Sequence, residues 1–418
     1  MTLQRLVRVP RELDSVIDIA KSEVDPASVG SSKSDVEALW RSVVDLYETG
    51  TQPAVSMCLM RKGEVVLERA IGHHSGNAPG DPPDGERRLI RHDTPFCLFS
   101  ASKAVTAMMI HLLDDRGLLH IDDRVVEYIP EFGRNGKEST TIRHVLTHRA
   151  GIPSVAGEHN DLQLLTQWDR IVELLCDARP VWKAGRRLGY HAITGGFILG
   201  EIVRRVTGKD IRAFFEEEIK QPLGFEWFQY GVPKEKVGEV AQNAFTGLPV
   251  PPGISHLIQR ALGVPIEDAV RLSNDERFLT AIVPAGNMVA TAREAATFFE
   301  LLRRGGRLGK NRIFDARTVR RAVGESSWLE VDLTLVLPIR YSLGFILGSE
   351  VVSLYGPDTP NAFGHLGFIN VLCWADPERE LSAALLTSGK PFVGSHLGAM
   401  VRLLSTISRR FPKTHLGH

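Results

Sequence analysis

The pattern of apolar positions predicts strands near both ends of the chain and helices between them. Residues 1–35 are polar and irregular, and we interpret them as an N-terminal arm. A helix is expected next, because apolar residues recur at helical spacing from Val36 to Leu46. Two β-rich runs, 54–60 and 64–71, flank Arg61-Lys62-Gly63 and predict a hairpin.

The middle of the chain has a mainly helical periodicity. Helices are expected at 104–116, 142–147, 162–176, 193–206 and 211–219. Residues 222–275 hold many prolines, glycines and aromatics with little periodicity, which is typical of a cover or lid. Their aromatic side chains could form a local core or a wall of an acyl pocket, and the pattern does not decide between the two.

The C-terminal third returns to β structure. After a helix at 292–304, strands are expected at 341–347, 368–374 and 381–386, followed by an amphipathic helix at 395–407. This order predicts one sheet built from both ends of the chain, with a helical lobe inserted and a cleft between the two. The predicted class is α/β plus all-α, with these domain ranges: a discontinuous α/β domain of 36–105 and 290–418, and a helical domain of 106–289 that includes the lid-like segment 222–275.

Composition excludes several classes of partner. Fifty basic residues balance fifty acidic ones, so no field attracts nucleic acid or an anionic membrane. No stretch approaches the roughly 18 apolar residues of a membrane span, and the N-terminus lacks the apolar run of a signal peptide, so we expect the cytoplasm. Cys58, Cys97, Cys176 and Cys373 lie far apart without a C-x-x-C pair, which predicts reduced thiols.

Ser100 and Lys103 are the only serine and lysine in the chain at S-x-x-K spacing. Residues three apart on a helix share one face, so the Lys103 amine can reach the Ser100 hydroxyl. A neutral amine there can take the hydroxyl proton as the oxygen attacks an acyl carbon. The apolar run 104–110 would favour the neutral amine by burying it. The alternative is an ordinary helix N-terminus that Ser100 or Ser102 caps.

Five segments in order resemble the serine hydrolases of the β-lactamase and penicillin-binding type, and within that group the family VIII carboxylesterases. They are Phe99–Lys103, Leu146–Pro153 (similar to L-L-T-H-T-S-G-L-P), Gly185–Gly196, Pro284–Met288 and Gly364–Phe368. The resemblance covers about residues 50–405. It implies a β-lactamase-like fold, in which helices flank an antiparallel sheet and a helical lobe is inserted, with Ser100 as nucleophile.

Tyr190 lies in the segment that is similar to the one carrying the family's catalytic tyrosine. The resemblance implies that Tyr190 shares a proton with Lys103. An ammonium group nearby favours phenolate, so we expect the pKa of Tyr190 to be lowered. Either group can then be the general base, and the sequence does not assign the proton.

His365, Leu366 and Gly367 occupy the position of K-T-G in penicillin-recognising relatives. The resemblance implies that the backbone N–H groups of Phe368 and Ser100 form an oxyanion hole. Glycine at 367 would let a substrate approach the backbone of a strand that Phe368 enters.

Two departures from the family pattern favour esters over β-lactams. His365 replaces a charged lysine by a group that is mostly neutral at pH 7. Ala192 replaces the asparagine of Y-x-N and cannot hydrogen-bond a substrate amide. With Leu366 and Gly367, these two residues form the predicted substrate-binding set. The departures do not exclude weak β-lactamase activity.

Other catalytic motifs have less support. No G-x-S-x-G is present, which disfavours an α/β-hydrolase nucleophile elbow. His144 and His148 have the i, i+4 spacing of metal ligands, but the glutamate of H-E-x-x-H is absent and their run matches the family's structural loop. We therefore expect neither a metal nor an organic cofactor.

The sequence thus predicts a serine hydrolase that cleaves a small-molecule carboxylic ester through an acyl-enzyme on Ser100. Acyl transfer to an alcohol, β-lactam hydrolysis and D-amino-acid peptide hydrolysis are alternatives on the same residues. A pseudoenzyme that only binds a ligand is the non-enzyme alternative. The natural substrate, its acyl length and the oligomeric state stay open.

Overall fold

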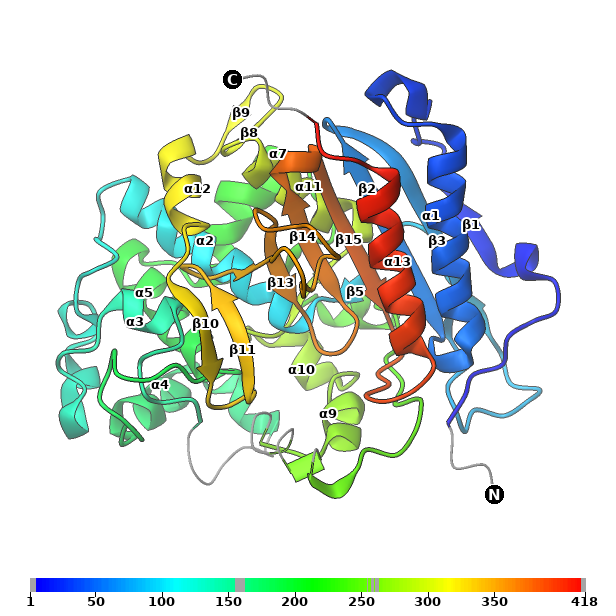
Figure 1. Ribbon diagram of the computed structural model, residues 1–418. Coiled ribbons are helices and arrows are strands. Elements are labelled where there is room, and N and C mark those ends of the chain that lie inside the picture. Colours follow the sequence, from blue (N-terminus) through cyan, green and yellow to red (C-terminus); the bar gives the residue numbers. More distant parts are fainter. Residues whose placement is uncertain (1–4, 155–161, 254, 257–258, 260–262, 415–418) are drawn as a thin grey trace.

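A ten-stranded antiparallel sheet joins the two ends of the chain in the computed structural model, which describes residues 5–154, 162–253, 255–256, 259 and 263–414 (Figure 1). In spatial order its strands are β1 (Ile17–Ile19), β3 (Glu64–Ser75), β2 (Ala54–Arg61), β15 (Leu381–Thr387), β14 (Leu372–Asp376), β13 (Phe363–Leu366), β12 (Ile346–Leu347), β11 (Leu337–Tyr341) and β10 (Ser327–Asp332), with β4 (Arg88–Leu89) beside β3. Strands from the first 75 residues thus meet strands from the last hundred, which confirms the predicted sheet from both termini.

The hairpin of β2 and β3 shows how local sequence sets this sheet. Lys62 and Gly63 both have positive φ angles, 53° and 92°, which match the twist of two strands joined by a tight turn. Every residue of β2 is buried, since helices cover both faces of the sheet here. The predicted hairpin is confirmed.

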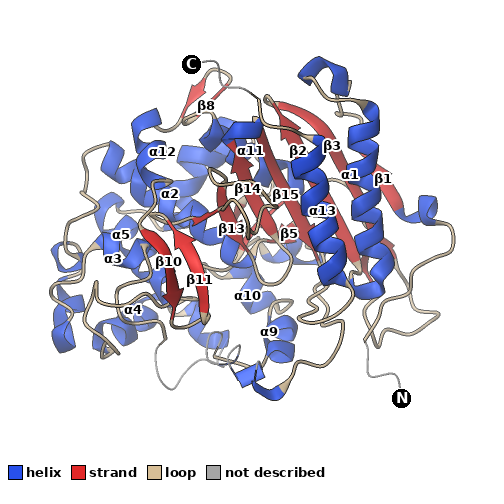
Figure 2. Cartoon of the chain, viewed as in Figure 1, coloured by secondary structure: helices blue, strands red, loops and turns tan. Residues whose placement is uncertain are grey.

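Helices form a layer on each face of the sheet, as Figure 2 shows. The α-helices are α1 (Lys33–Leu46), α2 (Ser102–Asp115), α3 (Ile142–Leu146), α4 (Trp168–Asp177), α5 (Thr194–Thr207), α6 (Ile211–Phe215), α7 (Gln221–Leu223), α9 (Ile266–Leu272), α10 (Glu276–Thr280), α11 (Ala292–Arg303), α12 (Ala316–Ala322) and α13 (His396–Arg410). Helices α1 and α13 pack side by side on one face, and α11 packs against β2, β14 and β15 on the other.

Shorter helical turns link these elements. They are Leu13–Val16, Pro26–Val29, Tyr47–Thr51, Phe99–Ala101 (η4), Val125–Glu127, Pro130–Gly136, Leu162–Thr166, Glu216–Lys220, Lys234–Glu239 and Pro377–Arg379. Two small sheets complete the description: β5 (Phe96–Cys97), β7 (Met288–Ala290) and β6 (Gln229–Tyr230), and the pair β8 (Arg307–Leu308) and β9 (Asn311–Arg312).

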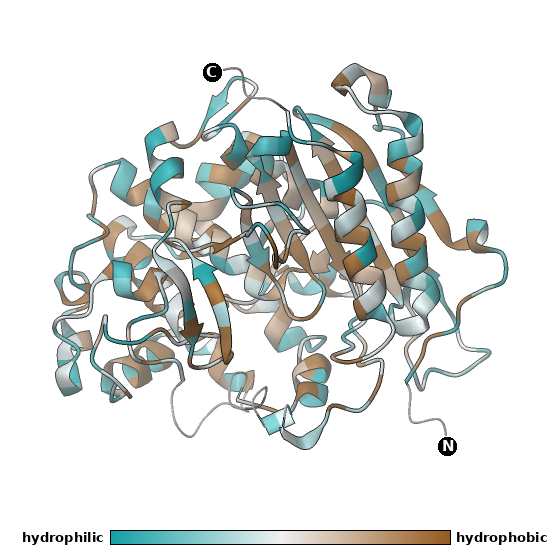
Figure 3. Cartoon of the chain, in the orientation of Figure 1, coloured by the Kyte–Doolittle hydropathy of each residue, from teal (hydrophilic) through white to brown (hydrophobic). Residues whose placement is uncertain are grey.

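Two hydrophobic cores lie on the two faces of the sheet. One fills the space under α1 and α13, and the other extends from α11 through α2 and α5 into the helical region. The sheet strands are mostly apolar in Figure 3, whereas the outward turns of the flanking helices are hydrophilic. The predicted class, an antiparallel sheet flanked by helices with a helical lobe inserted, is confirmed. The domain boundaries stay a prediction.

Three local expectations differ from the structure. Residues 17–19, assigned to an irregular arm, form the edge strand β1 on β3. The hairpin of β10 and β11 was missed, since only 341–347 was expected to be extended. The expected strand 368–374 is instead a turn followed by β14, because Ile369 and Asn370 adopt left-handed φ angles of 50° and 62° that break a strand.

Within the described residues, no helix is both long and apolar enough to cross a membrane. The cysteines Cys58, Cys97, Cys176 and Cys373 are buried and unpaired, as expected of reduced thiols.

Gly364 tests how tightly the sheet is packed beside the candidate site. A Cβ at Gly364 would lie 2.3 Å from the Cys373 carbonyl oxygen and 2.5 Å from Trp374 Cβ. We predict that Gly364→Ala destabilises the protein by about 1–3 kcal/mol, because β13 and β14 must separate to admit the methyl group. Thermal unfolding measures the effect. Gly238→Ala is the matched control, since nothing lies within 4 Å of its added Cβ, and an unchanged Tm for both variants would contradict the packing described.

Candidate active site

Ser100 lies in a strained turn that leads directly into helix α2. The turn is η4, and Phe99, the residue before Ser100, has a φ of 49° that a bulky residue rarely adopts. The hydroxyl of Ser102 stabilises this turn by donating to the Phe99 carbonyl at 2.5 Å and accepting the Met288 N–H at 3.0 Å. No side chain caps the N-terminus of α2, so the alternative interpretation of Ser100 or Ser102 as a helix cap is wrong.

Lys103 lies one turn further along and reaches back to Ser100. Its Nζ is 3.0 Å from Ser100 Oγ, 2.7 Å from the Ala192 carbonyl oxygen and 3.0 Å from the Ala285 carbonyl oxygen. The side chain is 8% exposed, and burial lowers the pKa of the Lys103 amine to about 7. The expected burial of the lysine is thus confirmed.

Tyr190 meets the same pair from the segment before α5. Its ring centroid is 4.7 Å from Lys103 Nζ, and its hydroxyl interacts with that of Ser100. The expected lowering of its pKa is wrong: burial raises the pKa of Tyr190 well above its ordinary value, and the charge of Asp332 adds to this. The physical reason is that Lys103 is itself buried, which disfavours the ammonium that was expected to stabilise a phenolate.

The segment from His365 to Phe368 lies opposite Ser100, at the tip of the β13–β14 hairpin. His365 and Leu366 end β13, and Gly367 and Phe368 begin the turn, so Phe368 leaves a strand rather than entering one. The Phe368 ring lies 5.5 Å from that of Phe99, which brings the turn against the nucleophile segment.

Gly367 is required by close packing within the protein, and the expected approach of a substrate to its backbone stays a prediction. A Cβ there would lie 2.4 Å from the carbonyl oxygen of Leu98, two residues before Ser100. The close approach is therefore between two segments of the protein itself. It fixes the distance between the turn and Ser100.

Ala192 and His365 contribute to the site in different ways. The Ala192 methyl group lies in a small apolar cluster with Leu188, Tyr190 and Tyr341, while its carbonyl oxygen accepts from Lys103. His365 is buried, and burial with the nearby Lys103 charge lowers the pKa of its imidazole to about 3. The imidazole is therefore neutral at pH 7, as expected from the sequence.

The imidazoles of His144 and His148 lie in different surroundings and share no contact that would make them a pair of metal ligands. His144 Nδ1 accepts the Thr141 N–H at 3.1 Å, whereas His148 is buried beside Tyr190 with ring centroids 4.8 Å apart. No group of three or more metal-ligating side chains occurs among the residues that the structure describes.

Two aromatic residues of the lid-like segment form core rather than a pocket wall. Phe228 and Tyr230 are fully buried and pack on Phe215, with ring centroids 5.3 Å and 5.7 Å away. The open question from the sequence is thus settled in favour of local core for these two rings.

Two buried ionisable groups near the site were missed from the sequence. Lys390 Nζ donates to the Thr387 carbonyl at 2.7 Å and lies 4.8 Å from the Phe99 ring centroid, with its pKa lowered to about 7 by burial. The carboxylate of Asp332 accepts the Tyr190 N–H at 3.1 Å. Both come from segments without a motif, so only the fold brings each of them close to the site.

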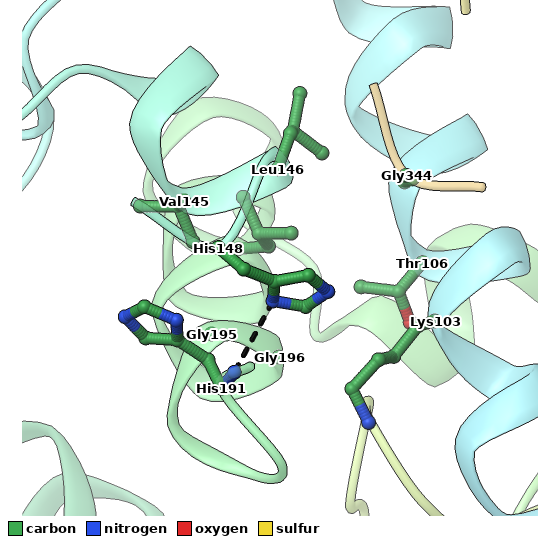
Figure 4. A pocket seen from close by; sticks show the side chains of 11 residues that line it. Lys103, Thr106, Val145, Leu146, His148, His191, Gly195, Gly196 and Gly344 are labelled. Carbon is green, nitrogen blue, oxygen red and sulfur yellow. Dashed lines mark hydrogen bonds between the residues drawn. The ribbon is translucent and has the colours of Figure 1, made fainter. Parts of the chain in front are cut away.

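A cavity of about 30 Å³ lies behind Lys103, lined also by Thr106, His148 and His191. Figure 4 shows His148 between His191 and Lys103, with its hydrogen bond to the His191 N–H. This volume holds one or two water molecules and no substrate. A substrate must therefore reach Ser100 from its other, partly exposed side.

Comparison with known proteins agrees with this geometry. The Beta-lactamase family model matches residues 41–405. A Mycobacterium tuberculosis protein described as esterase/beta-lactamase LipL is 31% identical over 312 residues, which cover 70% of this chain and 69% of the relative. The crystal structure of a family VIII carboxylesterase superposes with a TM-score of 0.76 at 27% identity, covering 90% of this chain and 98% of that chain.

A penicillin-binding protein homologue from Caulobacter crescentus is equally similar in structure. Its TM-score is also 0.76 at 27% identity, and the match covers 91% of this chain and 99% of that chain. The resemblance seen in the five sequence segments is therefore confirmed over most of the chain, which belongs to the Beta-lactamase family of serine hydrolases.

Proposed function

We propose that this protein is a carboxylesterase that hydrolyses small esters through an acyl-enzyme on Ser100. The observation that carries the proposal is the set of three hydrogen bonds at Lys103 Nζ. A neutral amine has two N–H donors and one lone pair. With the Ala192 and Ala285 carbonyl oxygens accepting the two N–H groups, the lone pair is directed at Ser100 Oγ.

Acylation then proceeds with Lys103 as general base. As Ser100 Oγ attacks the ester carbonyl carbon, Lys103 takes the hydroxyl proton and becomes an ammonium ion. The oxyanion that forms is held by the N–H groups of Ser100 and Phe368. This role is supported by the Phe368 N–H, which has no hydrogen-bond partner within the described part of the chain.

Release of the alcohol requires a proton on the leaving oxygen. The Tyr190 phenol is suited to donate it, because its raised pKa keeps it protonated at neutral pH. The Lys103 ammonium can return a proton to Tyr190, and a water molecule then hydrolyses the acyl-enzyme by the reverse sequence of proton transfers. No metal or organic cofactor enters this scheme.

The preference for esters over β-lactams rests on Ala192 and His365. A β-lactam carries a carboxylate and an amide, and the family pattern provides a lysine and an asparagine for them. Here the corresponding positions offer a neutral imidazole and a methyl group. A β-lactam therefore finds neither a cation for its carboxylate nor a hydrogen-bonding side chain for its amide. A simple ester has neither group and needs neither contact. The name of one similar structure, a family VIII carboxylesterase, points the same way, whereas the esterase/beta-lactamase LipL is named for both activities.

Ser100→Ala tests the nucleophile. We predict loss of hydrolysis of short p-nitrophenyl esters, because no other hydroxyl can replace Oγ. A fluorophosphonate probe should add its mass to the peptide with Ser100 in the parent protein and not in the variant. Ser102 is retained in the variant and serves as an internal control. Hydrolysis retained by the variant would exclude the proposal. A parent protein that the probe does not label would also exclude it and would indicate a pseudoenzyme.

The pH profile tests Lys103 as base. Below its pKa of about 7 the amine carries a proton and cannot accept another, so kcat/KM should rise with pH through about 7. Lys103→Arg keeps the charge at every accessible pH and should lower kcat/KM by about 10²-fold or more. The control is Lys137→Arg, since Lys137 Nζ only donates to three structural carbonyls. A parent profile that is flat between pH 5 and 9 contradicts the assignment.

Product analysis separates hydrolysis from the alternative reactions. We expect faster turnover of p-nitrophenyl butyrate than of a chromogenic cephalosporin or a D-alanyl peptide, because Ala192 and His365 offer no matching contacts. With a competing alcohol present, the free acid should remain the main product. A dominant transesterification product would instead identify an acyltransferase.

A further inference from the structure

His148 holds the chain on both sides of Tyr190. It lies in the turn after α3, and its carbonyl oxygen accepts the Gly189 N–H at 3.0 Å. Its imidazole Nδ1 accepts the His191 N–H at 3.2 Å, which is the bond drawn in Figure 4. One residue from outside the segment therefore fixes both neighbours of Tyr190.

The backbone of His148 is left-handed. Its φ angle is 58°, in a region that few residues other than glycine enter, with asparagine and histidine among those few. The residue is buried, and its ring centroid lies 4.8 Å from that of Tyr190 and 5.1 Å from that of Tyr341. A left-handed residue persists in a packed structure only where its surroundings hold it. The conformation therefore points to a defined role for His148, beyond that of a turn residue.

The contacts of His148 decide which of its ring nitrogens carries the proton. A backbone N–H can only donate, so Nδ1 offers its lone pair and the proton of the neutral ring is on Nε2. Burial keeps the pKa of His148 well below its ordinary value, so the ring is neutral at pH 7. His191 follows the same rule, since its Nε2 accepts the Ile152 N–H at 3.2 Å. An apolar ring in place of His148 would leave the buried His191 N–H without this acceptor, which is costly.

The segment that His148 holds carries two groups of the candidate site. Tyr190 brings its hydroxyl to that of Ser100, and the Ala192 carbonyl oxygen accepts from Lys103 Nζ at 2.7 Å. A shift of this segment would therefore move the phenol and the carbonyl together, relative to the nucleophile and the base. Catalysis is sensitive to such shifts, since a displacement of about 1 Å can lower a rate by about 10²-fold.

We propose that His148 is a positioning residue of the ester hydrolysis proposed above. Its unprotonated Nδ1 holds the segment 189–192, so that the Tyr190 phenol and the Ala192 carbonyl stay beside the nucleophile and the base. His148 acts through these two residues and takes no proton in the reaction. The inference rests on the proposed function for its effect on rate, whereas the position of the ring proton does not depend on that function.

Packing of the ring alone is the competing explanation, because the imidazole also contacts two tyrosine rings. Two substitutions separate the explanations. His148→Asn removes the ring but keeps an acceptor, since Oδ1 is bonded to Cγ as Nδ1 is, and asparagine tolerates a positive φ angle. His148→Phe keeps an aromatic ring and removes the acceptor.

We expect His148→Phe to lower kcat/KM for p-nitrophenyl butyrate by about 10²-fold, because the segment is no longer held, and His148→Asn to lose no more than about tenfold. Each variant is measured well below its Tm, so that a loss of stability does not enter the rate. His144→Phe is the matched control. It removes a similar bond, from the Thr141 N–H to His144 Nδ1 at 3.1 Å, and should leave kcat/KM unchanged.

The opposite order of the two variants would overturn the proposal. A His148→Phe protein as active as the parent would show that the acceptor is not needed. A His148→Asn protein that loses as much activity as His148→Phe, or that does not fold, would show that the ring alone matters. If His148→Phe does not fold, His148→Asn decides by itself, and a loss beyond about tenfold overturns the proposal.

The ring nitrogens of His148 provide a test that needs no turnover. In the ¹⁵N-histidine NMR spectrum of the parent protein at pH 7, His148 should show an unprotonated Nδ1 and a protonated Nε2. The signals are assigned by their loss in His148→Asn. A proton on Nδ1 would overturn the proposal. If Ser100→Ala shows that the proposed function is wrong, this spectrum still decides whether Nδ1 is the acceptor.

Discussion

The burial of one lysine amine beside one serine hydroxyl is the constraint on which the site depends. An amine in water would be protonated at pH 7 and could not activate Ser100. Here three parts of the chain enclose it: the start of α2, the carbonyl of Ala192 before α5 and the carbonyl of Ala285 before β7. These three segments must therefore be folded against one another before Lys103 has its lowered pKa.

The surroundings of this pair are polar but largely uncharged at neutral pH. The imidazoles of His148, His191 and His365 all have pKa values pushed far down by burial, and the Tyr190 phenol has its pKa pushed up. Such a site suits a neutral ester better than an anionic β-lactam, because it offers no fixed positive charge.

Much of the fold could be predicted because its elements have strong local patterns. Helical spacing identified α1, α2, α5, α11 and α13, and the Arg61-Lys62-Gly63 turn identified the β2–β3 hairpin. The strand β1 and the β10–β11 hairpin were missed because they are short edge elements whose pairing depends on neighbours distant in sequence. The turn after Gly367 was misread as strand, since nothing local marks Ile369 for a positive φ angle.

The site was predictable to the extent that its residues lie in motifs. Ser100, Lys103, Tyr190 and the His365–Phe368 segment come together as expected, although their catalytic roles rest on the proposal. Asp332 and Lys390 could not be found, because neither lies in a motif and each meets the site through residues distant in sequence. The direction of the Tyr190 pKa was wrong because burial cannot be read from a single sequence. The most direct test of the central claim is mass spectrometry of the protein mixed with a slowly deacylating ester and quenched in acid. An acyl group on the peptide that holds Ser100 is the predicted result, and ester turnover without any adduct on Ser100 would contradict it.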